Sequence, residues 1–433
     1  MSTDHNRTDL ENAADLAGLA ANANAFDAVV VGGGPAGATA AHELAGLGHS
    51  VLLLDRDGRI KPCGGAIPPK LIRDFQIPDS MLVAKVTKAR MIAPSAKHVD
   101  IPIEGGFVGM VDRCDFDEWL RVRAAKAGAV RRTGSFVRIE RDGQGNATVC
   151  YKPKGESPAQ VDEDGLVRVA ARTVIGADGA RSNVARSEVP GGDEIPYVIA
   201  YHEIVESPAQ AADFDPARCD VYYNGEMSPD FYGWVFPHGK TTSVGMGTAQ
   251  RGFSLRDATA HIRDVAGLAD AQTIREEGAP IPLKPLARWD NGRDVILAGD
   301  AAGVVAPASG EGIFYAMLGG RLAAEAVDEC LVSGDAKALT QARKRFMRVH
   351  GGVFWILGIM QKYWYTNDDR RERFVRICRD IDVQQLTFDA YMNKEVEIDA
   401  YVTHNLPLSD INKAFELMHN GESLRCVISM HDE

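Results

Sequence analysis

The stretch FDAVVVGGGPAGATAAHELAG, residues 26–46, decides the fold of this chain. Its first six residues are an apolar, valine-rich run, which predicts a buried parallel strand, and Ala38 to Gly46 predict a helix. Residues 49–55, HSVLLLD, predict a second strand that ends on an acid, Asp55. Strand, glycine turn, helix and strand together form one βαβ unit.

The turn inside this unit has the spacing of a dinucleotide site. Gly32 permits a tight turn, Gly34 lets the backbone approach a pyrophosphate, and Gly37 lets the helix pack on the strand. The amino end of the helix offers free N–H groups to phosphate, and Asp55 is placed to accept from ribose hydroxyls. The alternative is a glycine turn that binds no nucleotide.

Two later segments have the same character. Asp178 follows a predicted strand at 171–175 and lies in GADGARS, and Asp300 follows the predicted strand VILA at 295–298. Each alone is an ordinary turn. Asp300 precedes Ala-Ala-Gly, which predicts another helix start, where an acid can bind ribityl hydroxyls and the helix faces phosphate. Residues 307–313, PASGEGI, add a second glycine-rich turn before a helix, near an expected isoalloxazine edge. The order of the three segments favours FAD held by an interleaved two-domain enzyme.

Composition narrows the class of protein. The chain has 433 residues, 45% of them hydrophobic, which suffices for two or three domains. Lys plus Arg number 48 against 60 Asp plus Glu, and this net charge of -12 argues against nucleic-acid binding. The seven cysteines are scattered without C-x-x-C, so we expect no metal site, no disulfide framework and a reducing compartment. The most apolar late stretch, 353–360, is much shorter than the ~20 residues of a spanning helix.

The remaining pattern gives the domain organisation. Residues 116–127 predict a helix, 134–174 predict strands, 197–250 predict an antiparallel sheet, and 311–332 and 336–392 predict helices. We expect an α/β fold in which a Rossmann-like FAD-binding domain is interleaved with an antiparallel-sheet substrate domain. The FAD-binding domain takes residues 26–85, 105–190 and 288–335, and the substrate domain takes 86–104 and 191–287. A mobile arm at 1–25, a helical region at 336–394 and an atypical tail at 395–433 complete the chain.

Further motifs identify a family. The three flavin segments resemble the flavoprotein class that contains aromatic hydroxylases and geranylgeranyl reductases. Residues 61–68, KPCGGAIP, and 229–237, PDFYGWVFP, closely resemble the geranylgeranyl reductases of chlorophyll and bacteriochlorophyll synthesis. The resemblance covers about residues 26–393, including VDRCDFD at 111–117 and LTFDAY at 386–391.

The resemblance implies roles for individual residues. Those implied to hold FAD are Gly32, Gly34, Ala36, Gly37, Asp55, Arg56, Arg113, Asp178, Gly299, Asp300, Gly310 and Gly312. Those implied to line the prenyl channel are Gly64, Gly65, Tyr232, Trp234 and Phe236. Cys63 and Tyr232 are the candidate proton donors, and no metal is implied. Three alternatives remain: Trp234 and Phe236 as plain core residues, Arg113 as a surface partner of Asp115 or Asp117, and Cys63 as a small buried hydrophobe.

The implied reaction is the FAD-dependent, NADPH-driven reduction of geranylgeranyl double bonds to phytyl. Its substrate is geranylgeranyl-(bacterio)chlorophyll or geranylgeranyl diphosphate, and a cytoplasmic enzyme peripheral to the photosynthetic membrane is expected. The segment 353–360, followed by Tyr363, Trp364 and Tyr365, faces the membrane or closes the channel in one interpretation and packs in the core in another. The competing functions are an aromatic monooxygenase, an archaeal-type prenyl lipid reductase, and a pigment-binding or assembly factor that uses FAD structurally.

The end of the chain departs from the reductases. Residues 398–430 resemble the closing segment of zinc-dependent medium-chain alcohol dehydrogenases. They predict a strand, a helix with Ser409 as N-cap, and a strand from Ser423 to Ser429. Neither zinc ligands nor a second nucleotide fold accompanies them, so we expect a tail that the chemistry does not need.

Overall fold

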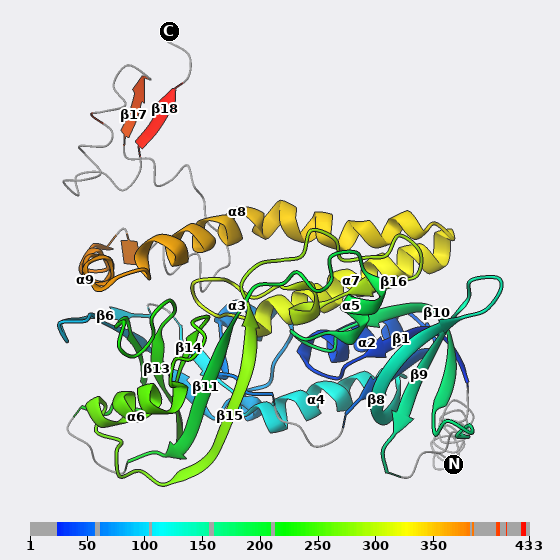
Figure 1. Ribbon diagram of the computed structural model, residues 1–433, viewed down its shortest axis with the longest axis horizontal. Coiled ribbons are helices and arrows are strands. Elements are labelled where there is room, and N and C mark those ends of the chain that lie inside the picture. Colours follow the sequence, from blue (N-terminus) through cyan, green and yellow to red (C-terminus); the bar gives the residue numbers. More distant parts are fainter. Residues whose placement is uncertain are drawn as a thin grey trace, which may run out of the picture.

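The computed structural model describes residues 24–56, 61–103, 106–155, 160–208, 213–381, 383–384, 404–407, 413 and 426–429. A six-stranded sheet and a seven-stranded sheet occupy opposite ends of the main body, and the long helix α8 (Thr340–Trp364) runs along both (Figure 1). Of the predicted arm at 1–25, residues 1–23 lie outside the described residues, and Ala25 already begins a strand.

The six-stranded sheet contains the predicted βαβ unit. Its strands are β1 (Ala25–Val31), β2 (Val51–Asp55), β8 (Val130–Arg141), β9 (Ala147–Pro153), β10 (Val167–Gly176) and β16 (Val295–Leu297). β8, β2, β1, β10 and β16 pair in parallel in that order, while β9 pairs antiparallel with β8 and β10. Helix α2 (Pro35–Gly46) connects β1 to β2, as the sequence predicts.

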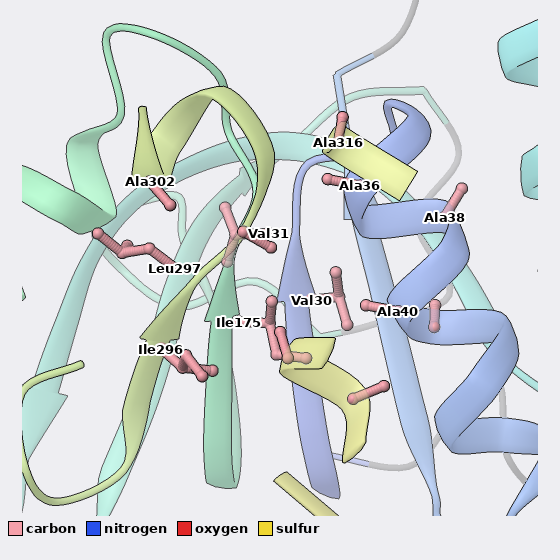
Figure 2. Packing of buried hydrophobic residues seen from close by; sticks show 14 of the residues in the cluster. Val30, Val31, Ala36, Ala38, Ala40, Ile175, Ile296, Leu297, Ala302 and Ala316 are labelled. Atoms are coloured by element: carbon pink, nitrogen blue, oxygen red, sulfur yellow. The ribbon is translucent and has the colours of Figure 1, made fainter. Parts of the chain in front are cut away.

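Buried side chains from the strands of this sheet and from α2 form one apolar core. Val30 and Ile175 are fully buried, as expected for parallel strands with both faces packed (Figure 2). Helix α7 (Ile313–Ser333) lies directly on α2, because a Cβ on Gly320 would stand only 2.2 Å from the carbonyl oxygen of Ala36. The first turn of α2, where phosphate binding is expected, is therefore held between the sheet and α7.

The seven-stranded sheet has the order β15-β11-β14-β13-β12-β5-β6. Its strands are β5 (Lys88–Ile92), β6 (His98–Pro102), β11 (Tyr197–Glu206), β12 (Arg218–Tyr222), β13 (Gly233–His238), β14 (Thr241–Thr248) and β15 (Thr273–Pro282). The sheet is antiparallel, as predicted, except that β5 and β12 pair in parallel. Parallel neighbours need a long connection, and the FAD-side elements between residues 103 and 197 provide it.

Short elements connect the two sheets. The three-stranded sheet β3 (Ala66–Ile67), β7 (Val108–Met110) and β4 (Ala84–Val86) leads into helix α4 (Arg113–Lys126). Helix α4 begins three residues before the predicted Phe116, because the Asp112 carboxylate caps it by accepting from the Cys114 N–H at 2.7 Å. The other short elements are α3 (Pro69–Asp74), α5 (Asn183–Glu188), α6 (Leu255–Val265), η1 (Asp79–Met81) and η3 (Ala336–Leu339).

The structure corrects the predicted helix start at Asp300. Gly299–Ala302 form a single 3-10 turn that ends at Gly303, whose φ of 78° is left-handed. The helical region contains α8 and α9 (Asp368–Ile377), and its part beyond residue 384 lies outside the described residues. In the tail, β17 (His404–Pro407) pairs in parallel with β18 (Cys426–Ser429), while the predicted helix after Ser409 lies outside the described residues apart from the single helical position Lys413.

Candidate active site

The three glycine segments meet at the carboxyl ends of three parallel strands. Gly32 has a φ of +107°, and a Cβ there would lie 2.3 Å from the carbonyl oxygen of Ala177, next to Asp178. A Cβ on Gly299 would lie 2.7 Å from the Cβ of Ala36. The turns after β1, β10 and β16 are therefore in direct contact, at the edge where open α/β sheets bind their ligands.

The first turn has the shape that a dinucleotide needs. A Cβ on Gly37 would lie 1.8 Å from the carbonyl oxygen of Gly32. Helix α2 can therefore approach the end of β1 this closely only with glycine at position 37. A Cβ on Gly34, in contrast, would meet no atom within 4 Å, and the backbone there is open at the start of α2. Open backbone at a helix amino end fits a diphosphate such as that of FAD.

Asp55 lies at the end of β2 beside this turn. Its carboxylate accepts from Nη1 of Arg121 at 3.3 Å, and the same nitrogen donates to the carbonyl oxygen of Gly33 at 3.2 Å. Arg56 follows and is exposed. No sequence motif indicates Arg121, which stands within α4. Its cation brings positive charge to the predicted ribose and phosphate site.

Asp178 and Asp300 differ in their surroundings. The Asp178 carboxylate accepts from the Ser182 hydroxyl and from the Asn183 N–H at 2.7 Å, so it stabilises the first turn of α5, and burial raises its pKa. The Asp300 carboxylate is buried and forms an ion pair with the Lys61 ammonium group. This pair joins the turn after β16 to the segment that carries Cys63.

Gly310 and Gly312 precede α7, with Gly312 as its N-cap residue. The Tyr232 hydroxyl donates to the carbonyl oxygen of Ser309 at 2.6 Å, and a Cβ on Gly310 would lie 3.0 Å from that hydroxyl oxygen. Burial raises the pKa of Tyr232, with further contributions from Tyr365 and Glu311. The second glycine turn therefore lies against Tyr232, the residue that precedes β13 of the other sheet.

Cys63 is half-buried in the turn before β3. Its Sγ accepts from the Gly65 N–H at 3.4 Å. Arg113 lies next to this thiol and is buried, and it pairs with Asp117 through two hydrogen bonds of 2.8 and 2.7 Å. Burial lowers the pKa of Arg113, but the Asp117 carboxylate and the Cys63 thiol together raise it above its usual value. One alternative places Arg113 at the surface as a partner of Asp115 or Asp117. Arg113 does pair with Asp117, but it is buried and not at the surface.

Strand β13, which we call the aromatic strand, lies against the Cys63 turn. The rings of Trp234 and Phe236 lie on one face of the strand, with their centroids 6.2 Å apart. The ring centroids of Tyr232 and Trp234 are 6.0 Å apart. A Cβ on Gly64 would come within 3.1 Å of the Phe236 ring. Tyr232 and Trp234 belong to an apolar cluster against which α8 packs through Leu357, Met360 and Trp364.

Polar residues that no motif predicted surround the other side of Cys63. His238 is half-buried, its Nδ1 lies 2.9 Å from the carbonyl oxygen of Phe236, and burial lowers its pKa. Gly65 must be glycine, since its φ is +69° and a Cβ would lie 2.6 Å from Nε2 of His238. Cys63, His238 and Glu277 line one small cavity of about 20 Å³, enough for one water.

A chain of hydrogen-bonded side chains links Trp234 to Glu277. The indole N–H donates to Oγ of Ser243 at 3.1 Å, and His202 lies 2.9 Å from the same oxygen and 3.1 Å from Glu277. Because an indole N–H can only donate, the Ser243 hydroxyl hydrogen is free for Nδ1 of His202. In the described part of the chain, no group of three His, Cys, Asp or Glu side chains is arranged to hold a metal ion.

Comparison with known proteins agrees with this geometry. Residues 25–337 match the family model for the FAD binding domain. Geranylgeranyl diphosphate reductase of Rhodobacter capsulatus is 60% identical over 373 residues, which cover 86% of this chain and 92% of that protein. The chain belongs to the geranylgeranyl reductase family of FAD-binding flavoproteins.

Other family members and solved structures are more distant. Geranylgeranyl diphosphate reductase of Synechocystis is 35% identical, covering 85% of this chain and 92% of that protein. Digeranylgeranylglycerophospholipid reductase of Methanoculleus marisnigri is 32% identical, and the match covers 72% of this chain and 79% of that protein. A geranylgeranyl bacteriochlorophyll reductase-like protein from Thermoplasma acidophilum has the same fold, with a TM-score of 0.73, 24% identity and coverage of 86% of this chain and 98% of that chain.

Proposed function

We propose that this chain reduces the double bonds of a geranylgeranyl group to give phytyl, using FAD as the bound cofactor and NADPH as the electron source. The observation that carries the proposal is the contact between the Cys63 turn and the aromatic strand, beside the three glycine turns. A half-buried thiol, an aromatic wall and an FAD-type fold supply a proton source, an apolar channel and a cofactor site. The family relatives are named as geranylgeranyl reductases, which supports the same reaction.

The residues of the first and third turns fit FAD. Gly32, Gly34 and Gly37 would accept the diphosphate of the cofactor, and Asp55 would accept hydroxyls of its adenosine ribose. Asp300 would accept hydroxyls of the ribityl chain. When bound, the flavin supplies hydride chemistry, and the protein supplies orientation and a channel that excludes water.

Reduction of an isolated double bond also needs a proton at the second carbon. Cys63 is the better donor, because the Tyr232 hydroxyl already donates to Ser309 and burial raises the Tyr232 pKa. Arg113 holds its position through Asp117 and places a positive charge next to the thiol that loses the proton. The apolar cluster around Trp234 excludes water from the prenyl chain.

Replacement of Cys63 tests this assignment. We expect C63A to lower the rate of double-bond reduction by about 10²- to 10⁴-fold, while NADPH still reduces the flavin. C114A, at an exposed thiol on α4, is the matched control and should keep both rates. Normal turnover in C63A and in Y232F would rule out both residues as the proton donor.

The substrate itself is tested by anaerobic incubation with NADPH. One arm uses geranylgeranylated bacteriochlorophyll and the other uses free geranylgeranyl diphosphate, and each is followed by product mass in steps of two hydrogens. Oxygen-dependent NADPH consumption with an aromatic compound would indicate a monooxygenase instead. A flavin that NADPH fails to reduce would indicate a pigment-binding or assembly factor. With the pigment as substrate, we expect a cytoplasmic enzyme attached peripherally to the photosynthetic membrane.

A further inference from the structure

Helix α8 exposes one continuous face along its whole length. Three of its exposed residues are cations, Lys344, Arg348 and Lys362. The other five are Val349, Gly352, Trp355, Ile359 and Tyr363, and the Trp355 side chain is 69% exposed. Steps of three and four residues lead from Lys344 through Arg348, Gly352, Trp355 and Ile359 to Lys362, so these residues share one side of the helix. We call these eight residues the α8 face.

The charge of this face is opposite to that of the protein. The net charge of the chain is -12, yet α8 contains five Lys or Arg residues and not one Asp or Glu. Two of the five basic residues have partners within the protein. Arg343 donates to the carbonyl oxygen of Leu286, and Arg345 forms ion pairs with Glu325 and Glu329. Lys344, Arg348 and Lys362 make no ion pair with any other residue that the structure describes.

The opposite side of α8 packs against the aromatic cluster of the proposed prenyl channel. Phe354 is buried against Tyr315, with ring centroids 4.9 Å apart, and Leu357 and Met360 contact the cluster that contains Tyr232 and Trp234. Of the two interpretations for residues 353–360, core packing therefore holds for one side of the helix only. Over this stretch, α8 therefore has one side on the aromatic cluster and the other side exposed.

We propose that the α8 face docks on the surface of an anionic lipid bilayer, with the helix lying in the plane of the headgroups. This inference rests on the proposed function, because a prenyl chain carried by a membrane pigment must reach the channel from the bilayer. Trp355 and Ile359 would enter the boundary between headgroups and acyl chains, and the three cations would contact lipid phosphates. No helix in the described part of the chain is long and apolar enough to cross a membrane, so attachment there would be at the surface.

The test is sedimentation of the full-length protein with vesicles, without substrate or NADPH. We expect binding to vesicles of equal parts phosphatidylcholine and phosphatidylglycerol, and much weaker binding to phosphatidylcholine alone. The triple variant K344Q/R348Q/K362Q should bind the anionic vesicles on the order of 100-fold more weakly, since each basic residue contributes about fivefold. The matched control K97Q/K126Q/K240Q changes the same charge at exposed positions elsewhere and should bind almost like the wild type.

A second pair of variants tests the apolar contact. W355E/I359E should lose vesicle binding, whereas V332E, at an apolar residue 78% exposed on α7, should keep it. Equal binding to neutral and anionic vesicles, or equal loss in the two triple variants, would overturn the proposal. A dimer that W355E/I359E converts to monomer, with vesicle binding unchanged, would mean that a second copy covers the face.

The same variants separate this inference from the proposed reaction. Reduction of free geranylgeranyl diphosphate by NADPH in solution should be unchanged in the α8 variants, since none of the substituted residues lines the proposed channel. If even the wild type reduces no prenyl substrate, the proposed function fails while the vesicle results still decide the docking surface. If the wild type reduces the diphosphate but binds no vesicles, the docking surface alone is overturned.

Discussion

The glycine turns after β1 and β16 and the surroundings of Cys63 lie side by side, but they are built in opposite ways. The turns work because side chains are missing, so that backbone segments approach within distances that no Cβ would permit, as at Gly32 and Gly37. Around Cys63, side chains from distant parts of the chain pair with one another, as Arg113 does with Asp117 and Trp234 with Ser243. The glycine turns therefore tolerate almost no added side-chain atom at Gly32 and Gly37. The surroundings of Cys63 depend instead on both members of each side-chain pair.

The largest effect should come from filling a glycine turn. G37V places a side chain where the carbonyl oxygen of Gly32 stands, 1.8 Å from the new Cβ. We expect the purified variant to lack FAD and to lose more than about 4 kcal/mol of unfolding free energy, measured by urea denaturation. The control is G46A at the end of the same helix, where a Cβ meets no atom within 4 Å, and it should change the unfolding free energy by less than about 1 kcal/mol. Retention of FAD by G37V would contradict this account of the turn.

A smaller but still large effect should come from breaking the buried pair beside Cys63. D117N leaves the Arg113 guanidinium buried with a neutral partner, which should cost about 3 kcal/mol or more of unfolding free energy. D115N, two residues earlier and exposed, should cost less than about 1 kcal/mol. If the two variants unfold at the same urea concentration, the pair contributes little and the contrast between the two regions weakens.

The smallest effect concerns the pH dependence of stability. The folded-state pKa of His238 is lowered by burial, so the folded protein binds this proton less readily than the unfolded chain does. Stability should therefore be undiminished above about pH 6.5 and decline as pH falls below it, at up to about 1.4 kcal/mol per pH unit. H238N should flatten this decline in urea unfolding measured between about pH 7 and 5, whereas H98N, at an exposed histidine, should leave it unchanged. An equal slope in both variants would assign the decline to other groups.

The contrast also explains which parts of the site could be predicted. The turn with Gly32, Gly34 and Gly37 can be predicted from spacing alone, because strand, turn and helix follow one another in the chain, and Asp55 ends the next strand. The role of these residues in holding FAD stays a prediction. Sequence patterns do not predict Arg121, Lys61 as the partner of Asp300, or His238 as the neighbour of Gly65. Each acts through a residue far away in the sequence, and no periodicity encodes such a pairing.

Two interpretations needed the fold before they could be decided. Asp178 follows a predicted strand as Asp300 does, yet its carboxylate accepts from the Asn183 N–H in the first turn of α5, while that of Asp300 pairs with Lys61. The segment 353–360 was open between core packing and an outward surface, and α8 has both, with Phe354 buried and Trp355 exposed. Adjacent residues on a helix point in different directions, so composition alone could not separate these roles.

The sequence by itself determined the βαβ unit, the FAD-type turns and the resemblance to geranylgeranyl reductases, because these depend on local backbone geometry and on contiguous motifs. Only the tertiary structure decided that Cys63 lies between a buried Arg113 and the aromatic strand, that β5 joins the second sheet in parallel with β12, and that α8 has a basic and apolar outer face. These features arise from contacts between segments far apart in the chain, and such contacts exist only after the two sheets have packed together.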